Sequence, residues 1–436
     1  MGGAVRDHSL RRIGWAMSLA KLPAAPPPAW ERSDLGVVPA FSLFEGDLLN
    51  RVYVQLGLGT HRRLYLLRRS GVMILLTWVP VAVLAWRQHL YELALSPINY
   101  FADFAAYIQF LLALPLFVAA ERIVDVSTRE AAEQFISCGV IRPEDTAQVG
   151  EIHATIERAR KAWWSDAVCI FFAYVFSLAI LVPEFGDNPL PSWHVQGDVH
   201  RRSLTAAGIW EFFIALPLLN YTWLRFIWKI LIWCYYLYRV TRLKLGLYST
   251  HPDLTGGLGF ISETQGRFAI FILAYGLSNI AAAVGYEIVV LNYDLSIMPV
   301  WGPLVGFAIG APLLFTLPLF MFTKQLFRTK RRALAAYRAR ISEQSRRVES
   351  YWQDSGQIHP AQEEIRELTE LTTLGTLFQR IERMRVVPFD LRSFGQLVGS
   401  TLGSIATLLP LLHAKGEFAG VVEMIGKLFG RISGTE

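Results

Sequence analysis

The chain has 436 residues, of which 53% are hydrophobic, with 27 Phe, 13 Trp and a formal net charge of +6. This apolar content exceeds what one soluble domain of such length can bury, so the composition excludes an ordinary soluble globular protein and indicates a membrane protein. The three cysteines indicate no disulfide framework, because two fall in apolar stretches and one in a basic loop.

Residues 1–40 are rich in Pro and Ala with scattered charge, which predicts a disordered tail. A signal peptide is the alternative, because Arg11 and Arg12 precede a short apolar run. We reject it, since Lys21 interrupts that run and a Pro-rich stretch follows. Residues 41–69 then repeat apolar side chains at helical spacing and end in a run of Arg and His, which predicts an amphipathic helix at the cytoplasmic interface.

Six stretches of about 17 to 24 mostly apolar residues are each long enough to cross the roughly 30 Å hydrocarbon core of a bilayer. They begin near Gly71, Asp103, Asp166, Ile209, Phe268 and Trp301. A seventh, weaker stretch covers residues 397–412. The sequence therefore predicts an all-α polytopic membrane protein, with six transmembrane helices arranged as three repeated hairpins and a seventh membrane segment near the C-terminus.

The positions of Lys and Arg between these stretches predict their orientation. Fifteen lie before the first stretch, between the second and third, and between the fourth and fifth, whereas the opposite loops hold only three Arg. By the positive-inside rule the N-terminus is cytoplasmic. The transmembrane domain then covers residues 70–323, with cytoplasmic helical loops at 121–164 and 239–267.

The returning stretch of each hairpin carries a Leu-Pro-Leu sequence, centred on Pro115, Pro217 and Pro318. Proline inside a transmembrane helix frees a carbonyl and kinks the axis. Three kinks at matched positions would shape a central cavity or a hinge. The alternative is chance, because prolines are ordinary in Leu-rich transmembrane helices, but the matched spacing and direction favour a repeat.

Two stretches carry a glycine at every fourth position. They are Gly302, Gly306 and Gly310 in the sixth, and Gly395, Gly399 and Gly403 in the seventh. Such stripes let helix backbones approach closely, so we expect these glycines to pack the two helices together, within one chain or between protomers. An oligomer interface or a pore wall is the alternative to plain packing, and we expect a homo-oligomer.

The fourth stretch covers residues 209–240 and must extend beyond the bilayer, because it would measure roughly 48 Å as a helix. It carries Glu211 near its outer end, and Arg225 and Lys229 one turn apart. Arg225 falls near the inner interface, which favours contact of both cations with lipid headgroups. The alternative is a cationic pore lining or a phosphate-binding lining.

Three acids, Asp103, Glu211 and Glu287, fall near the periplasmic ends of their stretches. Such acids form a cation-attracting mouth or a proton-coupling site, or they occupy ordinary interfacial positions. Polar residues deeper in the stretches favour hydrogen bonds between helices over contacts with a solute; they are Gln109, Asn220, Ser278 and Asn279. The residues predicted as candidates for a transport path are Asp103, Glu211, Asn220, Arg225, Lys229, Asn279 and Glu287.

Residues 324–394 predict a cytoplasmic helical region. Its first part, residues 324–347, holds nine Lys or Arg and a single Glu, which favours contact with anionic inner-leaflet lipids or with a neighbouring subunit, or else a solvated helix. Four glutamates begin the next helix and offer the opposite charge for docking: Glu363, Glu364, Glu367 and Glu370. Residues 395–436 predict the C-terminal membrane segment and an amphipathic helix.

The loop at residues 250–260 reads Thr-His-Pro-Asp-Leu-Thr-Gly-Gly-Leu-Gly-Phe. His251 and Asp253 have the chemistry to bind a metal or to share a proton, but a metal site needs three or more protein ligands. No strand precedes the glycines and no Lys-Ser/Thr follows them, so a phosphate loop is unsupported. We therefore favour a structural turn. The residues of this loop motif are His251, Asp253, Gly256, Gly257 and Gly259.

This loop resembles a motif of an uncharacterised family of multi-pass bacterial inner-membrane proteins. Residues 113–116 with 119–121, residues 385–389 and residues 406–412 are similar to the same family. The resemblance covers most of the chain from about Phe41 onward. It implies a bacterial inner-membrane location, and it implies no activity.

No paired Cys/His ligands, nucleophile elbow or phosphate loop appears, so the sequence predicts no enzyme, no catalytic residue and no metal or cofactor. The expected partner is the lipid bilayer with its anionic inner leaflet, and nothing indicates nucleic acid. We expect a channel or transporter for a small ion or solute. The alternative is a non-transporting scaffold or lipid-binding assembly protein, in which Arg225 and Lys229 would face lipid rather than a water-filled interior.

Overall fold

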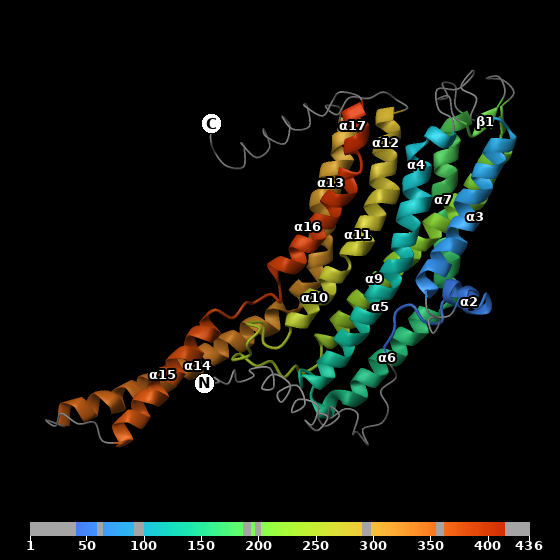
Figure 1. Ribbon diagram of the computed structural model, residues 1–436. Coiled ribbons are helices and arrows are strands. Elements are labelled where there is room, and N and C mark those ends of the chain that lie inside the picture. The colour runs from blue at the N-terminus through green and yellow to red at the C-terminus, as the bar shows by residue number, and fades with distance from the viewer. Residues whose placement is uncertain are drawn as a thin grey trace, which may run out of the picture. The chain divides into compact units, whose positions relative to one another are not determined.

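The computed structural model describes residues 41–58, 64–90, 100–185, 193–196, 202–289, 298–354 and 362–414 (Figure 1). The predicted disordered tail and the predicted amphipathic helix after residue 414 lie outside these ranges. The described residues are almost entirely helical, which confirms the all-α prediction. Their only strands, β1 (Val195–Gln196) and β2 (Ser203–Leu204), form one antiparallel pair in which Val195 lies opposite Leu204.

The α-helices of the described residues are α2 (Leu48–Gln55), α3 (Tyr65–Arg87), α4 (Phe104–Ala106), α5 (Leu114–Ser137), α6 (Thr146–Lys161), α7 (Trp163–Leu181), α8 (Ala206–Trp210), α9 (Leu216–Val240), α10 (Gly259–Arg267), α11 (Ala269–Tyr275), α12 (Ala282–Val289), α13 (Met298–Thr316), α14 (Thr323–Asp354), α15 (Gln362–Glu382), α16 (Leu391–Ala406) and α17 (Leu409–Ala414). Three π-helical segments also occur there: η2 (Tyr107–Ala113), η5 (Glu211–Ala215) and η6 (Gly276–Ala281). The 3-10 segments are η1 (Tyr100–Ala102), η3 (Pro143–Asp145), η4 (Val182–Phe185) and η7 (Leu317–Phe322).

Five helices of the described part are long and apolar enough to cross a membrane, as expected for a multi-pass membrane protein. They are Tyr65–Arg87, Phe104–Ser137, Trp163–Leu181, Gly259–Ile288 and Trp301–Ser350. The predicted fourth span, now the continuous helix of α8, η5 and α9, is not among the five. Asn220, Arg225 and Lys229 make it more polar than its neighbours. The predicted seventh segment, α16, is not among them either.

The apolar helices form one bundle, whose neighbours Figure 1 displays. On one side α3 contacts α5 and α8, and α7 runs against α9. In the middle, α5 contacts α10 and α11. On the other side α16 packs against α10, α11 and α13, so the predicted seventh segment belongs to the bundle. We call the two ends of the bundle the β1 end and the α6 end, after the elements that lie there.

All three Leu-Pro-Leu turns coincide with a departure from α-helical geometry. Pro115 and Pro217 lie in the first turn of α5 and α9, directly after the π-helical segments η2 and η5. There the Leu114 N–H donates to Gln109 O and the Leu216 N–H donates to Glu211 O, five residues back. A proline has no N–H for the usual bond to the fourth residue back, and the wider turn accommodates this loss. Pro318 lies instead in the 3-10 segment η7.

The chain before α3 differs from the predicted interfacial helix over residues 41–69. Within the described residues 41–58 the helix is α2 alone, and residues 41–47 are extended or turn-forming and enter the bundle. Asp47 stops the helix on its N-terminal side, because its side chain caps α2 by accepting a hydrogen bond from the Asn50 N–H. Gly57, with φ of +72°, follows its C-terminal end.

The glycine stripes do not bring α13 and α16 together, contrary to our expectation for a single chain. A Cβ placed on Gly306, Gly310, Gly395 or Gly399 would meet no atom within 4 Å, and one on Gly403 would meet only Leu273 at 3.5 Å. Gly306 and Gly310 instead line an apolar groove of about 380 Å³ between α9, α11 and α13. The two helices pack through other side chains, because the glycine faces point away from the contact.

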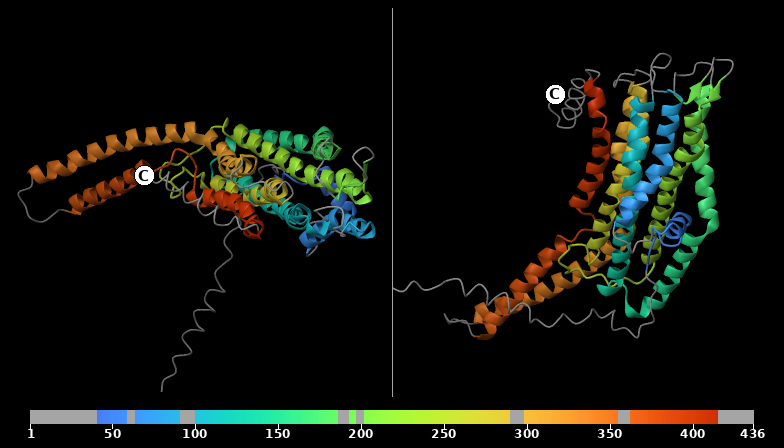
Figure 2. Two further views of the ribbon diagram at one scale, coloured as in Figure 1. Left: turned by 90° about the horizontal axis from the view of Figure 1, so that it is seen from above. Right: turned by 45° about the vertical axis from the view of Figure 1, so that its right-hand side comes forward.

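Two long helices, α14 and α15, form an antiparallel pair (Figure 2). Lys330 of α14 donates hydrogen bonds to the backbone oxygens of Glu382 and Met384, and so caps the end of α15. The Arg338 guanidinium lies 5.8 Å from the Phe378 ring centre. The acidic helix therefore docks on the basic helix as predicted, and the described ion pairs include none that joins the two.

Candidate functional site at the π-helical segments

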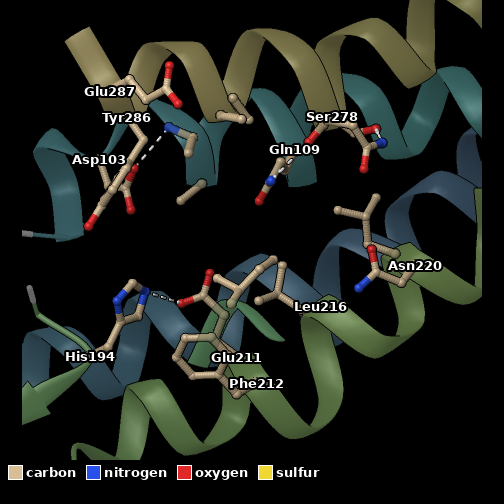
Figure 3. A pocket seen from close by; sticks show the side chains of 17 residues that line it. Asp103, Gln109, His194, Glu211, Phe212, Leu216, Asn220, Ser278, Tyr286 and Glu287 are labelled. Atoms are coloured by element: carbon tan, nitrogen blue, oxygen red, sulfur yellow. Dashed lines mark hydrogen bonds and ion pairs between the residues drawn. The ribbon is translucent and has the colours of Figure 1, made fainter. Parts of the chain in front are cut away.

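A cavity of about 460 Å³ lies toward the β1 end, between α12 and η6 on one side and η5 and α9 on the other (Figure 3). Seventeen described residues line it. Its polar lining consists of Asp103, Gln109, His194, Glu211, Asn220, Ser278, Asn279, Tyr286 and Glu287. The cavity thus brings together five of the seven predicted path residues: Asp103, Glu211, Asn220, Asn279 and Glu287.

The three π-helical segments supply the middle of this lining. Gln109 comes from η2, Glu211 from η5, and Ser278 and Asn279 from η6. Each segment ends in a bond to the fifth residue back, as the Ala282 N–H does to Leu277 O. A π-turn inserts one extra residue and rotates the side chains that follow, which is why such turns often carry functional groups. Here they aim polar side chains at the space between the helices.

The acids of the β1 end lie on facing walls, as Figure 3 shows for Asp103 and Glu287 above and Glu211 below. Asp103 caps α4 through the Ala105 N–H at 2.9 Å and accepts a hydrogen bond from Trp193 Nε1 at 3.1 Å. His194 Nε2 lies 3.0 Å from Glu211 Oε2. These contacts fix two of the three carboxylates at the rim of the cavity.

The amides of the lining also connect helices, as predicted for the deeper polar residues. Gln109 Nε2 donates to Ser278 O at 3.0 Å, and this bond joins η2 to η6. Asn220 Nδ2 donates to Ser177 Oγ at 3.1 Å, and this bond joins α9 to α7. Asn279 Nδ2 donates to Ser278 Oγ at 2.7 Å, within its own segment. The amides therefore hold the walls and still present polar groups to the cavity.

The charge of the described lining is negative. It contains three carboxylates, a single histidine, and neither Lys nor Arg. Carboxylates gathered around a cavity of low dielectric attract cations and repel anions. His194 was missed from the sequence, since it lies in a polar loop 17 residues before Glu211 and matches no motif.

Arg225 and Lys229 lie neither in this cavity nor toward lipid, which corrects both readings of the sequence. Their side chains are 1% and 2% exposed. Arg225 Nη1 lies 2.7 Å from Asp47 Oδ2, and Lys229 Nζ lies 3.3 Å from the same oxygen. The Arg225 guanidinium also pairs with Glu121 of α5. We call these four residues the buried charge network.

Asp47 holds the buried charge network together, although no sequence motif indicated it. Its side chain is fully buried. Oδ1 accepts a hydrogen bond from the Asn50 N–H of α2, and Oδ2 pairs with both cations. Burial alone would raise the pKa of Asp47, but the charges of Arg225 and Lys229 outweigh burial and lower it. Asp47 stays ionised and neutralises Arg225, 178 residues further along the chain, together with Lys229.

The loop at residues 250–260 is a turn built around one carboxylate. Asp253 accepts hydrogen bonds from the backbone of Thr255 at 2.9 Å, Gly257 at 3.0 Å and Gly259 at 2.9 Å, and His251 Nδ1 lies 2.8 Å from it. Gly256 and Gly257 have φ of +69° and +95°, which favour glycine. The loop thereby caps the start of α10. No cluster of three or more His, Cys, Asp or Glu suited to a metal ion occurs among the described residues.

Comparison of the chain with protein-family models, with curated proteins and with solved structures found no match. The resemblance of the loop motif to a bacterial inner-membrane family stays a prediction. The cavity and the buried charge network are the features of the structure that bear on function.

Proposed function

We propose that this protein is a membrane channel or transporter for a small ion or solute, in a bacterial inner membrane. The observation that carries this proposal is the cavity between the π-helical segments. Five residues that the sequence marked as intramembrane polar candidates line one space of about 460 Å³, large enough for a hydrated ion or a small organic molecule. Polar residues inside a membrane domain are costly unless they serve a path or a partner.

The proposal takes the helix of α8, η5 and α9 as a sixth span. Residues 206–240 form one continuous helix, roughly 52 Å long at 1.5 Å per residue, which exceeds the hydrocarbon core. Its cations are compatible with a membrane position, because Asp47 and Glu121 neutralise them inside the protein. In this topology the α6 end is cytoplasmic and the cavity lies in the outer half.

The charge of the lining favours cations or neutral polar solutes over anions. Asp103, Glu211 and Glu287 approach the cavity from three different helical segments, and no cation of the described lining offsets them. His194 adds an imidazole to the lining, with Nε2 3.0 Å from Glu211 Oε2.

A non-transporting scaffold or lipid-binding protein is the second candidate. The exposed cations of α14, such as Lys324, Arg328 and Arg332, favour it, because a basic helix attracts anionic lipids. The burial of Arg225 and Lys229 argues against the scaffold, because that hypothesis predicts that both side chains contact lipid.

Flux in proteoliposomes tests the proposal. Purified protein is reconstituted, and the fluxes of K⁺, Na⁺, Cl⁻ and acetate are compared with those of empty liposomes. The proposal expects flux of at least one probe above the empty control, and a changed rate or selectivity for Glu287→Gln. Folded and oriented protein that passes none of the four, nor small neutral solutes such as glycerol and urea, would favour the scaffold.

A further inference from the structure

Residues 41–50, which we call the gate segment, occupy a socket at the α6 end formed by α5, α6, α7 and α9. Asp125 of α5 anchors its start by accepting three hydrogen bonds: from Ser42 Oγ at 2.8 Å, from Leu43 N at 2.9 Å and from Phe44 N at 3.3 Å. Arg160 of α6 donates to Ser42 O at 2.6 Å. Polar contacts to side chains of other elements thus hold the start of the segment, and the buried Phe41 ring adds contacts with Trp233 and Tyr236.

Further contacts close the socket around the gate segment. Asp166 of α7 accepts a hydrogen bond from Leu48 N at 3.4 Å and another from Tyr221 of α9 at 2.9 Å. The Phe44 ring lies 5.1 Å from the Phe226 ring. Ser42, Phe44 and Asp47 are all buried. One short segment thus touches four helices that come from distant parts of the chain.

The ion pairs of Asp47 make the charge balance of the buried charge network depend on the position of the gate segment. With the segment in place, Arg225 and Lys229 face Asp47 and Glu121, so two cations balance two carboxylates. Without it, the two cations keep Glu121 as their ion-pair partner, with the Asp166 carboxylate also acting on Lys229. Unbalanced buried charge is unstable in a dry interior. Water must therefore enter the socket whenever the segment leaves it.

The gate segment and the cavity both adjoin α9. Asn220, which lines the cavity, and Arg225 are five residues apart on α9, which is roughly 7.5 Å along the helix axis. Aromatic rings pack beside Arg225, with Phe226 stacked on Phe271 at 4.3 Å between ring centres and Phe117 beside Phe271 at 5.7 Å. Phe44 of the gate segment contacts these rings through Phe226.

We propose that the gate segment closes the inner end of the transport path, and that the ion pairs of Asp47 with Arg225 and Lys229 are its latch. This inference rests on the proposed function and names its regulation. The structure described here is the closed state. Release of Asp47 exposes Arg225 and Lys229 to water and opens the cavity toward the α6 end, so a segment that lies before the first candidate span of the described residues controls the flux.

The test combines flux with an independent measure of segment position. Cys138, Cys169 and Cys234 are replaced by Ala, and Ser42→Cys is added as a reporter, since Ser42 is buried in the socket. Reaction of this cysteine with an impermeant maleimide reports opening, whether or not anything is transported. Fluxes of K⁺ and Cl⁻ are measured in proteoliposomes of the same proteins without the reporter.

The principal variant is Asp47→Asn, which keeps the shape of the side chain and removes its charge. We expect labelling and flux both to rise roughly tenfold, the effect of about 1.4 kcal/mol on the closing equilibrium. Glu45→Gln is the matched control, because Glu45 lies in the same segment and its side chain is 62% exposed. It should change neither quantity by more than about twofold, as surface pairs contribute little.

A second variant provides an independent test in case Asp47→Asn does not fold. Asp125→Asn weakens the three hydrogen bonds to the start of the gate segment and leaves the buried charge network intact, and it should raise labelling and flux in the same direction. Unchanged labelling in both variants overturns the gate. Faster labelling with wild-type flux also overturns it and leaves the transport function standing. Faster labelling with no flux in any protein overturns the proposed function and the gate with it.

Discussion

At the residue scale, buried charge in this protein falls into two separate groups. The cavity at the β1 end carries carboxylates, whereas both mid-helix cations of α9 belong to the buried charge network. The separation matters because a buried cation within a few ångströms of the cavity would neutralise its field. Asp47 and Glu121 confine the positive charge to the α6 end.

Replacement of either cation of the network by Met, which is apolar and unbranched, should destabilise the fold unequally. Arg225→Met leaves both Asp47 and Glu121 without their shared partner, so we expect a loss of about 3 to 5 kcal/mol. Lys229→Met leaves Asp47 paired with Arg225 and should cost about 1 to 3 kcal/mol. Thermal unfolding in detergent measures both. The exposed Arg242 is the control, and equal losses at all three positions would refute the network.

Asp253 should make the loop sensitive to acid. Burial alone would raise its pKa, but hydrogen bonds from Thr255 and Gly259 and the contact with His251 lower the pKa to about 2. Because the folded pKa lies below the unfolded value of 3.8, the stabilisation is complete above about pH 4 and is lost as the pH falls toward about 2.

The Asp253→Asn variant tests the predicted direction of this pH dependence. It should be less stable than the wild type by about 1 to 3 kcal/mol at pH 7, and the difference should shrink between about pH 4 and pH 2.5. Denaturation curves at several pH values measure the difference. Glu263→Gln serves as the control, since Glu263 is exposed. A difference that does not change with pH would mean that the carboxylate charge is irrelevant.

At the element scale, the π-helical segments connect the prolines to the cavity. Pro115 and Pro217 each follow a π-turn whose residues line the cavity, so the Leu-Pro-Leu pattern marks its walls on two helices. On the third wall η6 has no proline, and Gly276 begins it instead. A Cβ on Gly276 would lie 2.3 Å from Ser404 Oγ and 2.6 Å from a Phe307 ring carbon. The glycine is needed there for close packing of α16.

This contact predicts opposite outcomes for two glycines of the bundle. Gly276→Ala should lower stability by about 1 to 3 kcal/mol, the usual cost of overpacking a core. Gly306→Ala should be neutral or stabilising by up to about 1 kcal/mol, because nothing lies near its Cβ position and Ala favours the helix. Thermal unfolding of the two variants side by side decides the matter. A larger loss at Gly306 would show that its face is packed in the membrane, for example against a second copy.

At the scale of the whole molecule, the cavity should select by charge. Glu211→Gln and Glu287→Gln each remove one of three carboxylates from the described lining, so we expect the ratio of K⁺ to Cl⁻ flux to fall by roughly threefold to tenfold in each. Reversal potentials across a salt gradient measure this ratio. Glu349→Gln, on the exposed face of α14, should leave the ratio unchanged. If the ratio of K⁺ to Cl⁻ flux is unchanged in all three variants, the transport path does not pass through this cavity.

Much of the fold followed from local patterns. Apolar stretches predicted all five helices that are long and apolar enough to span. The fourth stretch, predicted over residues 209–240, is present as the continuous helix of residues 206–240. The glycine stripes misled us, because a stripe indicates that a close approach is possible but does not say which neighbour makes it.

The sequence by itself determined that the chain is helical, that five of its helices are long and apolar enough to span a membrane, and which polar residues the apolar stretches contain, because hydropathy and periodicity are properties of neighbouring residues. Only the tertiary structure decided that five of these residues share one cavity and that Arg225 and Lys229 pair with Asp47. The physical reason is distance along the chain. An ion pair across 178 residues depends on how helices pack, and no local pattern records that packing.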